Sequence, residues 1–300
     1  MTRLARIPMT VNTDGLEWRR AKWSWPFKAY YYLSSMIICL ACGSVVSDSR
    51  ALQDFYRRRF LKRTSFIPYG FPALTAVSHT RQQEILKSLD LDEGRYFLQV
   101  TRIEPDNLPL EIVKAFVGSR LGRQGFKMVS VGYKDATEYA RRLIAYDGSF
   151  GVQIRNACYD KDTLYTLRKN CFCYVHGNSV GGTNPALLEA MACCPRILAL
   201  DCDFSHEVLG STGMYFDRAN IEESFLSVAT SNISANAMLN RVASSYQWDA
   251  VAESYMRLAN GDLAIYTPQA VPVNTQYREP VQPAKEEELQ RAVEHLLEEV

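Results

Sequence analysis

Short apolar runs alternate along the chain with longer stretches in which apolar side chains recur at helical spacing. This alternation is typical of α/β folds, in which parallel strands are joined by helices. The runs that predict buried strands are residues 96–100, 126–132, 151–157, 171–176 and 197–200. The sequence therefore predicts a parallel sheet covered by helices from about residue 84 onward.

The segment before residue 84 shows the same alternation over a shorter length. A strand is expected at residues 8–11 and ends in the turn that contains Asp14. Asp14 then stands at the carboxyl end of a strand, where α/β folds bind ligands. The same position also suits an Asx turn that caps the next helix.

The run from Ala29 to Val46 contains no charged residue. Its length just reaches that of a membrane span, but Ser34, Ser35 and Gly43 interrupt its hydrophobic centre. We therefore expect a buried helix that leads into a strand, with a membrane-facing patch as the alternative. A basic cluster follows on the next predicted helix, either as solvated surface or as a contact with an anionic membrane or acceptor lipid. The cluster consists of Arg57, Arg58, Arg59, Lys62 and Arg63.

The composition is that of an ordinary globular protein, with 300 residues, 47% hydrophobic and 22% charged residues. A net charge of +1 gives no indication of nucleic-acid binding. The eight cysteines lie mostly in apolar segments, and the Cys39-x-x-Cys42 pair has no second pair. We expect buried free thiols in a reducing cytoplasm rather than disulfides or zinc.

The stretch Cys171–Leu200 combines a strand, a turn rich in glycine and the start of a helix. Thr183 or Asn184 can cap this helix, and Pro185 suits its first turn. The unpaired amides at such a helix start face outward and attract anions, so a phosphate site is expected here. A plain strand–helix connection is the alternative, because neither GxGxxG nor GxxxxGK[ST] is present.

Several polar side chains follow the predicted strands. Glu189 lies one turn into the helix after the glycine turn, where a carboxylate can hold the two hydroxyls of a ribose. Arg102 lies just past a strand end and suits either a phosphate or an ion pair with Glu104. His206 and Glu207 begin a short helix, where a cap or surface pair is favoured over general acid–base catalysis.

Two phrases carry a family resemblance: DGLEWRRAKW near the start and VHGNSVGGTNPALLEAMA in the centre. They resemble family 4 glycosyltransferases, and more narrowly the bacterial rhamnosyltransferase-like branch with DGLEWxRxKW and HGxxVGGTNPSLLEAMA. The resemblance covers about residues 8–258. It implies the GT-B fold, an α/β architecture of two Rossmann-type domains with parallel sheets, of which the first is incomplete here.

The resemblance also implies roles for particular residues. In the family two glutamates follow this strand, and Glu189 matches the second, which holds the donor ribose. The first falls on Gly181, so His176 and the amides of Gly182, Thr183 and Asn184 are expected to hold the donor sugar instead.

Before the central stretch, Arg102 matches a family arginine on the donor pyrophosphate. The accompanying family lysine is replaced by Asn107, at a donor-binding position. Asp14 stands where the family often has a histidine near the donor sugar, and Gly15 and Glu17 are candidate sugar or acceptor contacts. Asp14 and His176 are therefore the catalytic candidates.

We expect four regions along the chain. Residues 1–83 correspond to the C-terminal part of the acceptor-side domain, and residues 84–260 to the donor-binding domain. Residues 261–284 form a proline-containing linker, and residues 285–300 an amphipathic helix. Only part of a first domain precedes the donor domain, so we expect missing upstream strands, an upstream-encoded fragment as a partner, and poor solubility and activity of this chain alone.

The expected function is retaining transfer of a sugar from a nucleotide diphosphate donor to a cell-surface polysaccharide or lipid-linked glycan. The branch resemblance suggests dTDP-L-rhamnose as donor, with no metal and no other cofactor. We expect a cytoplasmic protein, either free or peripheral on the inner face of the plasma membrane. The alternatives are a degenerate, non-catalytic protein that binds nucleotide sugar or a partner, and another enzyme of nucleotide sugars such as an epimerase.

Overall fold

Three short parallel strands form the sheet of the first unit, in the order β1-β2-β3. The computed structural model describes residues 9–13, 15–71, 76–132, 136–228, 235–262 and 266–267. The strands are β1 (Thr10–Asn12), β2 (Ser44–Ser47) and β3 (Ser65–Phe66). In the register of this sheet Val11 pairs with Val45, and Val46 pairs with Ser65. Helices α1 (Trp25–Ala41) and α2 (Arg50–Phe60) and the short 3-10 helix η1 (Glu17–Arg19) complete the unit.

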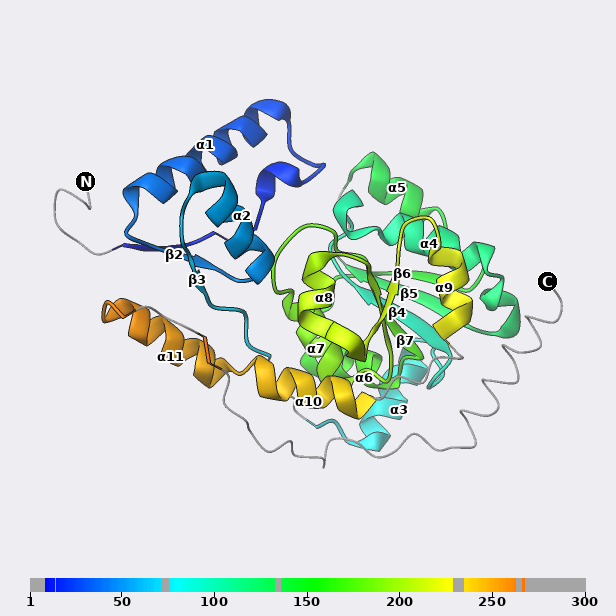
Figure 1. The fold of residues 1–300 in the computed structure, drawn as a ribbon. Helices are drawn as coiled ribbons and strands as arrows, with labels where there is room; N and C mark the ends of the chain where they lie inside the picture. The colour runs from blue at the N-terminus through cyan, green and yellow to red at the C-terminus, as the bar shows by residue number, and fades with distance from the viewer. Residues whose placement is uncertain are drawn as a thin grey trace.

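The second unit has a six-stranded parallel sheet in the order β6-β5-β4-β7-β8-β9 (Figure 1). Its strands are β4 (Tyr96–Val100), β5 (Lys127–Gly132), β6 (Val152–Asn156), β7 (Cys173–His176), β8 (Ile197–Leu200) and β9 (Met214–Phe216). The chain adds strands on one side of β4 and then returns to add β7 on its other side. The ends of β4 and β7 therefore form a switch point, the place where open α/β sheets bind ligands.

Helices cover both faces of this sheet. The helices are α3 (His79–Ser88), α4 (Pro109–Gly118), α5 (Glu138–Ile144), α6 (Lys161–Asn170), α7 (Pro185–Cys193), α8 (Asp203–Leu209), α9 (Ile221–Ser227) and α10 (Ala235–Ser245). Short 3-10 turns lie at η2 (Pro105–Asn107), η3 (Leu121–Gln124) and η4 (Gly210–Thr212). Successive strand residues enter opposite cores: Tyr174 packs with α6, α7 and α10, whereas Val175 packs with α4 and α9.

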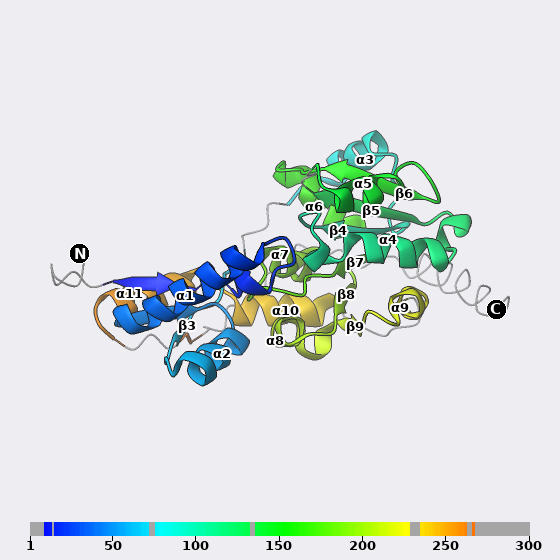
Figure 2. The same ribbon diagram turned by 90° about the horizontal axis from the view of Figure 1, so that it is seen from above.

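The last helix returns to the first unit. Figure 2 shows α10 and α11 (Trp248–Ala259) running from the second unit to the first. Ala250 and Val251 of α11 pack with Val46 and Ile67 in the core of the first unit. The chain therefore has two parallel-sheet units joined by a returning helix. The linker beyond residue 267 and the helix expected at residues 285–300 lie outside the described residues.

Helix α1 corrects the expectation of a buried helix. Only Ser35 and Cys39 of α1 are buried, while Trp25 is 78% and Leu40 71% exposed. Tyr30, Leu33, Met36 and Ile37 are also exposed and lie on the same arc of the helix. The outward side is thus the apolar one, and Ser35 faces inward. None of the described helices is long and apolar enough to cross a membrane.

Candidate functional site

The glycine turn begins where β7 ends at His176 and continues to the first turn of α7. The side chain of Asn184 caps α7 by accepting a hydrogen bond from the amide of Ala186 at 2.9 Å. Pro185 occupies the first position, where its missing N–H costs nothing. Gly177 is required by packing, because a β-carbon there would overlap the carbonyl oxygen of Asn107. The predicted strand, turn and capped helix are all present.

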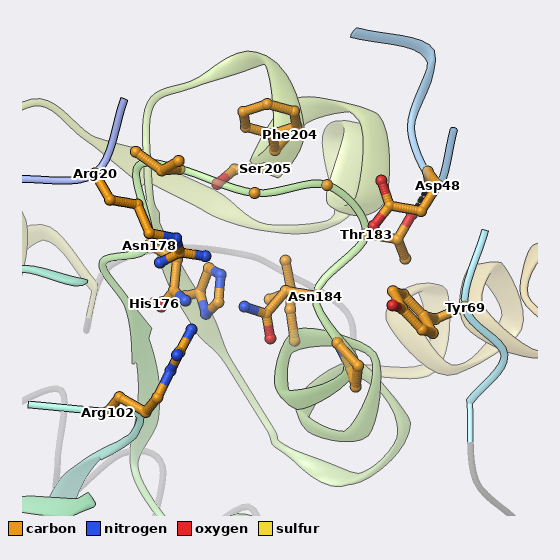
Figure 3. A pocket seen from close by; sticks show the side chains of 15 residues that line it. Arg20, Asp48, Tyr69, Arg102, His176, Asn178, Thr183, Asn184, Phe204 and Ser205 are labelled. Atoms are coloured by element: carbon orange, nitrogen blue, oxygen red, sulfur yellow. Dashed lines mark hydrogen bonds between the residues drawn. The ribbon is translucent and has the colours of Figure 1, made fainter. Parts of the chain in front are cut away.

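A cavity of about 250 Å³ lies in front of this turn, between the two units (Figure 3). It is lined by six residues that the sequence predicted as site residues: Arg102, His176, Gly181, Gly182, Thr183 and Asn184. Arg102 follows β4, His176 ends β7, and the other four residues form the turn that leads into α7. The switch point of the sheet and the start of α7 thus meet at one cavity.

His176 is 4% exposed at the end of β7. Burial lowers the pKa of its imidazole from 6.5 to about 4. At neutral pH the ring is therefore uncharged, with one nitrogen that donates and one that accepts a hydrogen bond. Such a ring can orient a sugar hydroxyl, but it does not supply a positive charge for a phosphate.

Arg102 follows β4, and its side chain is 58% exposed. Its Nη1 lies 3.6 Å from Oε1 of Glu104, so the ion pair considered as the alternative is present in the structure. Arg102 also lines the cavity, and Figure 3 shows its guanidinium directed toward His176. The loose pair with Glu104 leaves Arg102 able to meet an anion from the cavity side.

Asn107 lies behind the cavity rather than among the residues that line it. The side-chain amide of Asn107 donates to the backbone carbonyl of Arg102 at 2.9 Å. The backbone carbonyl of Asn107 accepts from the side-chain amide of Gln99 at 3.0 Å. The residue is buried in η2. Asn107 therefore braces the turn that carries Arg102, through its hydrogen bond to the Arg102 carbonyl.

Glu189 also lies outside the set of residues that line the cavity. Its carboxylate forms an ion pair with Arg168, a buried residue at the end of α6. Glu189 itself remains partly exposed. The sequence predicted a carboxylate for ribose at this position, and the structure gives this carboxylate a protein partner already.

The remaining predicted residues belong to the first unit. Asp14 lies outside the described residues. Gly15 abuts the glycine turn, since a β-carbon on it would lie 3.5 Å from Cα of Gly181. Glu17 accepts hydrogen bonds from Arg20 at 2.6 Å and from Trp23 at 2.9 Å. Burial acts to raise the pKa of Glu17, but these two hydrogen bonds and the charges of Arg20 and Lys22 outweigh it and lower the pKa below its usual value.

Sequence reasoning expected Asp14, Gly15 and Glu17 from the first unit and missed the residues with which that unit lines the cavity. Arg20, Asp48 and Tyr69 line it from that side, and Phe204 and Ser205 from α8. Arg20 belongs to the DGLEWRRAKW phrase, so a charged residue inside a distinctive motif was the available signal. Asp48 follows β2, and its place at the carboxyl end of a parallel strand was the corresponding signal.

Polar contacts hold the two units together around the cavity. The carboxylate of Glu207 accepts from the amide of Arg50 at 2.9 Å and from the amide of Ala51 at 3.4 Å, and so caps α2 from the other unit. The amide of Ala21 donates to Asp106 at 3.0 Å.

Within the second unit, His206 pairs with Asp201 at 2.8 Å. His206 and Glu207 thus make the surface pair and the cap that the sequence favoured.

No group of three or more His, Cys, Asp or Glu side chains within the described ranges has the geometry to hold a metal ion. All eight cysteines are free thiols, and six of them are buried.

Residues 6–72 match a family described as a domain of unknown function, DUF1972. No curated protein matches the sequence. Many solved structures are similar in fold, and three of them are described below. Anabaena HepE in complex with UDP and glucose has a TM-score of 0.71 at 13% identity, over 86% of this chain and 73% of that chain. A glycosyltransferase from Rickettsia africae has a TM-score of 0.67 at 12% identity, over 87% and 72%.

The third is a sucrose-phosphate synthase from Thermosynechococcus elongatus, with a TM-score of 0.63 at 18% identity, over 82% of this chain. This chain spans 65% of the length of that synthase. At these identities the likeness concerns the fold. The chain has the expected GT-B-like α/β fold with two parallel-sheet units, and the smaller first sheet is consistent with a partial first domain.

Proposed function

We propose that the chain binds a nucleoside diphosphate sugar in the cavity between the units and transfers the sugar to a glycan or lipid-linked acceptor. The observation that carries this proposal is the meeting of Arg102, neutral His176 and the capped start of α7 at one switch-point cavity. A guanidinium and the backbone amides of the glycine turn before α7 bind phosphate, and an uncharged imidazole suits a sugar hydroxyl.

Each part of the donor has a proposed partner. Arg102 and the turn that contains Gly181, Gly182, Thr183 and Asn184 hold the diphosphate. His176 orients the donor sugar. Asp14 is the second catalytic candidate, and Glu189 the candidate for the ribose.

We further propose that transfer proceeds with retention of configuration and without a metal. When the bond between sugar and phosphate breaks, negative charge builds on the leaving nucleoside diphosphate. Arg102 and the backbone amides of the glycine turn, which line the cavity, would offset that charge. Catalysis that is unchanged by a chelator is the expected result, and activity that requires added Mg²⁺ or Mn²⁺ would contradict it.

The donor is proposed from two sources. HepE is solved with UDP and with UDP-glucose, which makes UDP sugars reasonable probes. The motif resemblance points to dTDP-L-rhamnose, which we propose as the first donor to test. UDP sugars and dTDP-L-rhamnose both carry a pyrimidine nucleotide, so a single pocket could accept either.

We also propose that the first unit contacts an anionic lipid surface through the outward side of α1. This side carries only apolar residues, with Trp25 and Tyr30 among them. Next to it, Arg59 donates to Tyr32 of α1 at 2.5 Å, and Lys62 to the carbonyl of Cys42 at 2.6 Å. This positive rim attracts anionic lipid and would repel the same face of a second copy.

Pairing of Glu189 with Arg168 favours one alternative, a protein that binds nucleotide sugar without transferring it. Product analysis separates the two functions. The chain is incubated with dTDP-L-rhamnose or UDP-glucose and a glycolipid extract, and released nucleotide and labelled glycan are measured. Transfer that His176→Ala abolishes supports the enzyme, donor binding without product supports the alternative, and no binding of any nucleotide sugar overturns both.

A further inference from the structure

Arg20 and Arg102 belong to different units, and both side chains reach into the cavity near His176. Arg20 follows η1 of the first unit and is 8% exposed, and Arg102 follows β4 of the second. In Figure 3 the two guanidinium groups approach from opposite sides and both end close to His176. A nearly buried arginine that points into a cavity requires a reason beyond surface charge.

Neighbouring residues hold Arg20 in this position. Its Nε donates to Glu17 at 2.6 Å, which fixes one edge of the guanidinium. The next residue, Ala21, donates its amide to both carboxylate oxygens of Asp106, at 3.2 and 3.0 Å. The side chain of Arg20 is thereby fixed within the first unit, and the residue that follows it is anchored to the second unit.

A single carboxylate connects the two arginines. Nη1 of Arg20 lies 3.7 Å from Oε2 of Glu104, and Nη1 of Arg102 lies 3.6 Å from Oε1. Lys22 also reaches Oε1 of Glu104, at 3.0 Å. Glu17 and Glu104 together balance two of the three cations, so the charge that remains at this end of the cavity favours an anion.

We infer that Arg20 and Arg102 form a clamp, one arginine from each unit, for the diphosphate of a nucleotide. The inference rests on the proposed function, since it assumes that the cavity holds a nucleoside diphosphate. Asn107 braces the Arg102 turn and brings no charge, so Arg20 supplies the second cation. A planar guanidinium can bind two phosphate oxygens at once, and two such groups match the two phosphates of the ligand.

The clamp predicts a specific dependence on the second phosphate. Binding of UDP, dTDP and UMP is measured by calorimetry for the unchanged chain and for Arg20→Ala, Arg20→Lys, Arg19→Ala and Arg102→Ala. Arg20→Ala should weaken UDP and dTDP binding roughly tenfold to a hundredfold, the equivalent of one charged hydrogen-bonding group, and change UMP much less. Arg20→Lys keeps the charge and should recover part of the loss.

Arg19 is the matched control, because it precedes Arg20, is exposed and lies 5.4 Å from the ring of Phe55. Arg19→Ala should leave all three affinities unchanged. Equal loss of UDP and UMP binding in Arg20→Ala would mean a structural role and overturn the clamp. Unchanged UDP binding in Arg20→Ala, with a loss in Arg102→Ala, overturns the clamp and leaves the proposed function intact. If the unchanged chain binds neither UDP nor dTDP, the proposed function and the clamp both fall.

Discussion

Thr183, in the glycine turn of the second unit, donates its hydroxyl hydrogen to the backbone carbonyl of Asp48 at the end of β2. Both residues are buried. A β-carbon on neighbouring Gly182 would overlap the Asp48 carboxylate. The turn that forms the wall of the cavity is therefore also a joint between the two units.

This joint changes the reason for a prediction about Gly182. The sequence predicts a phosphate site at the turn that contains Gly182, where an added β-carbon would obstruct the ligand. In the structure the added carbon meets Asp48 instead, so we expect Gly182→Ala to lower the free energy of unfolding by about 1–3 kcal/mol and to weaken UDP binding. Denaturant unfolding and calorimetry measure the two effects.

The double variant Gly182→Ala/Asp48→Ala should recover part of the loss, because it removes the overlapping group. Gly43→Ala is the control, since a β-carbon there meets no neighbouring atom. Wild-type stability and binding in Gly182→Ala would show that the two units separate easily at this joint.

Glu189 and Arg168 give a second prediction. Glu189→Gln leaves the buried Arg168 without its partner, and we expect a loss of about 3–5 kcal/mol in the free energy of unfolding. If Glu189 also holds the ribose, the same variant should weaken UDP binding by roughly 2–3 kcal/mol.

Arg168→Gln breaks the same ion pair but keeps the carboxylate, so it separates the two roles. A loss of UDP affinity in Glu189→Gln alone indicates a ribose contact. Equal affinities for the two variants, at or near that of the unchanged chain, would show that Glu189 serves only the ion pair.

The buried imidazole of His176 predicts how stability depends on pH. In the unfolded chain the ring takes up a proton below about pH 6.5, whereas in the folded chain it stays neutral down to about pH 4. The unfolded state then binds more protons in this interval, so the free energy of unfolding falls as pH falls from 6.5 to 4. The contribution is about 3 kcal/mol at most.

Unfolding curves of the unchanged chain and His176→Gln between pH 7 and 4 provide the check. The difference between them should shrink steadily through this interval, because carboxylate titrations are common to both. A constant difference between the unchanged chain and His176→Gln would mean that His176 titrates normally.

The outward side of α1 predicts lipid binding. The chain should float with vesicles of phosphatidylcholine and phosphatidylglycerol more than with phosphatidylcholine alone, and alkaline carbonate should release it. Leu33→Glu/Ile37→Glu places charges on the apolar side and should reduce this binding about tenfold or more.

Phe150→Glu is the matched control, an exposed apolar residue of the second unit. It should bind vesicles as the unchanged chain does. Equal flotation of Leu33→Glu/Ile37→Glu would exclude α1 as the contact, and self-association without lipid binding would indicate a second copy as its partner.

The local pattern of the sequence was enough to predict the strand, turn and helix around His176 and Asn184. Apolar strand residues, glycines and an asparagine–proline helix start act over a few residues, so their geometry does not depend on distant parts of the chain. The alternation of such units also predicted the parallel sheet, because strands joined by helices can pair in parallel. The motif resemblance added the GT-B-like fold.

Tertiary structure alone decided which charges meet. Arg20 and Arg102 are far apart in the sequence and share Glu104 only because the two units dock. Glu189 has Arg168 as its partner because α6 and α7 pack side by side. Helix α1 has a mean apolar character that suited a buried helix, and only its placement at the edge of the first unit shows which side faces outward. Periodicity within a segment fixes which residues share a face, but what that face meets depends on packing between segments, which no local pattern encodes.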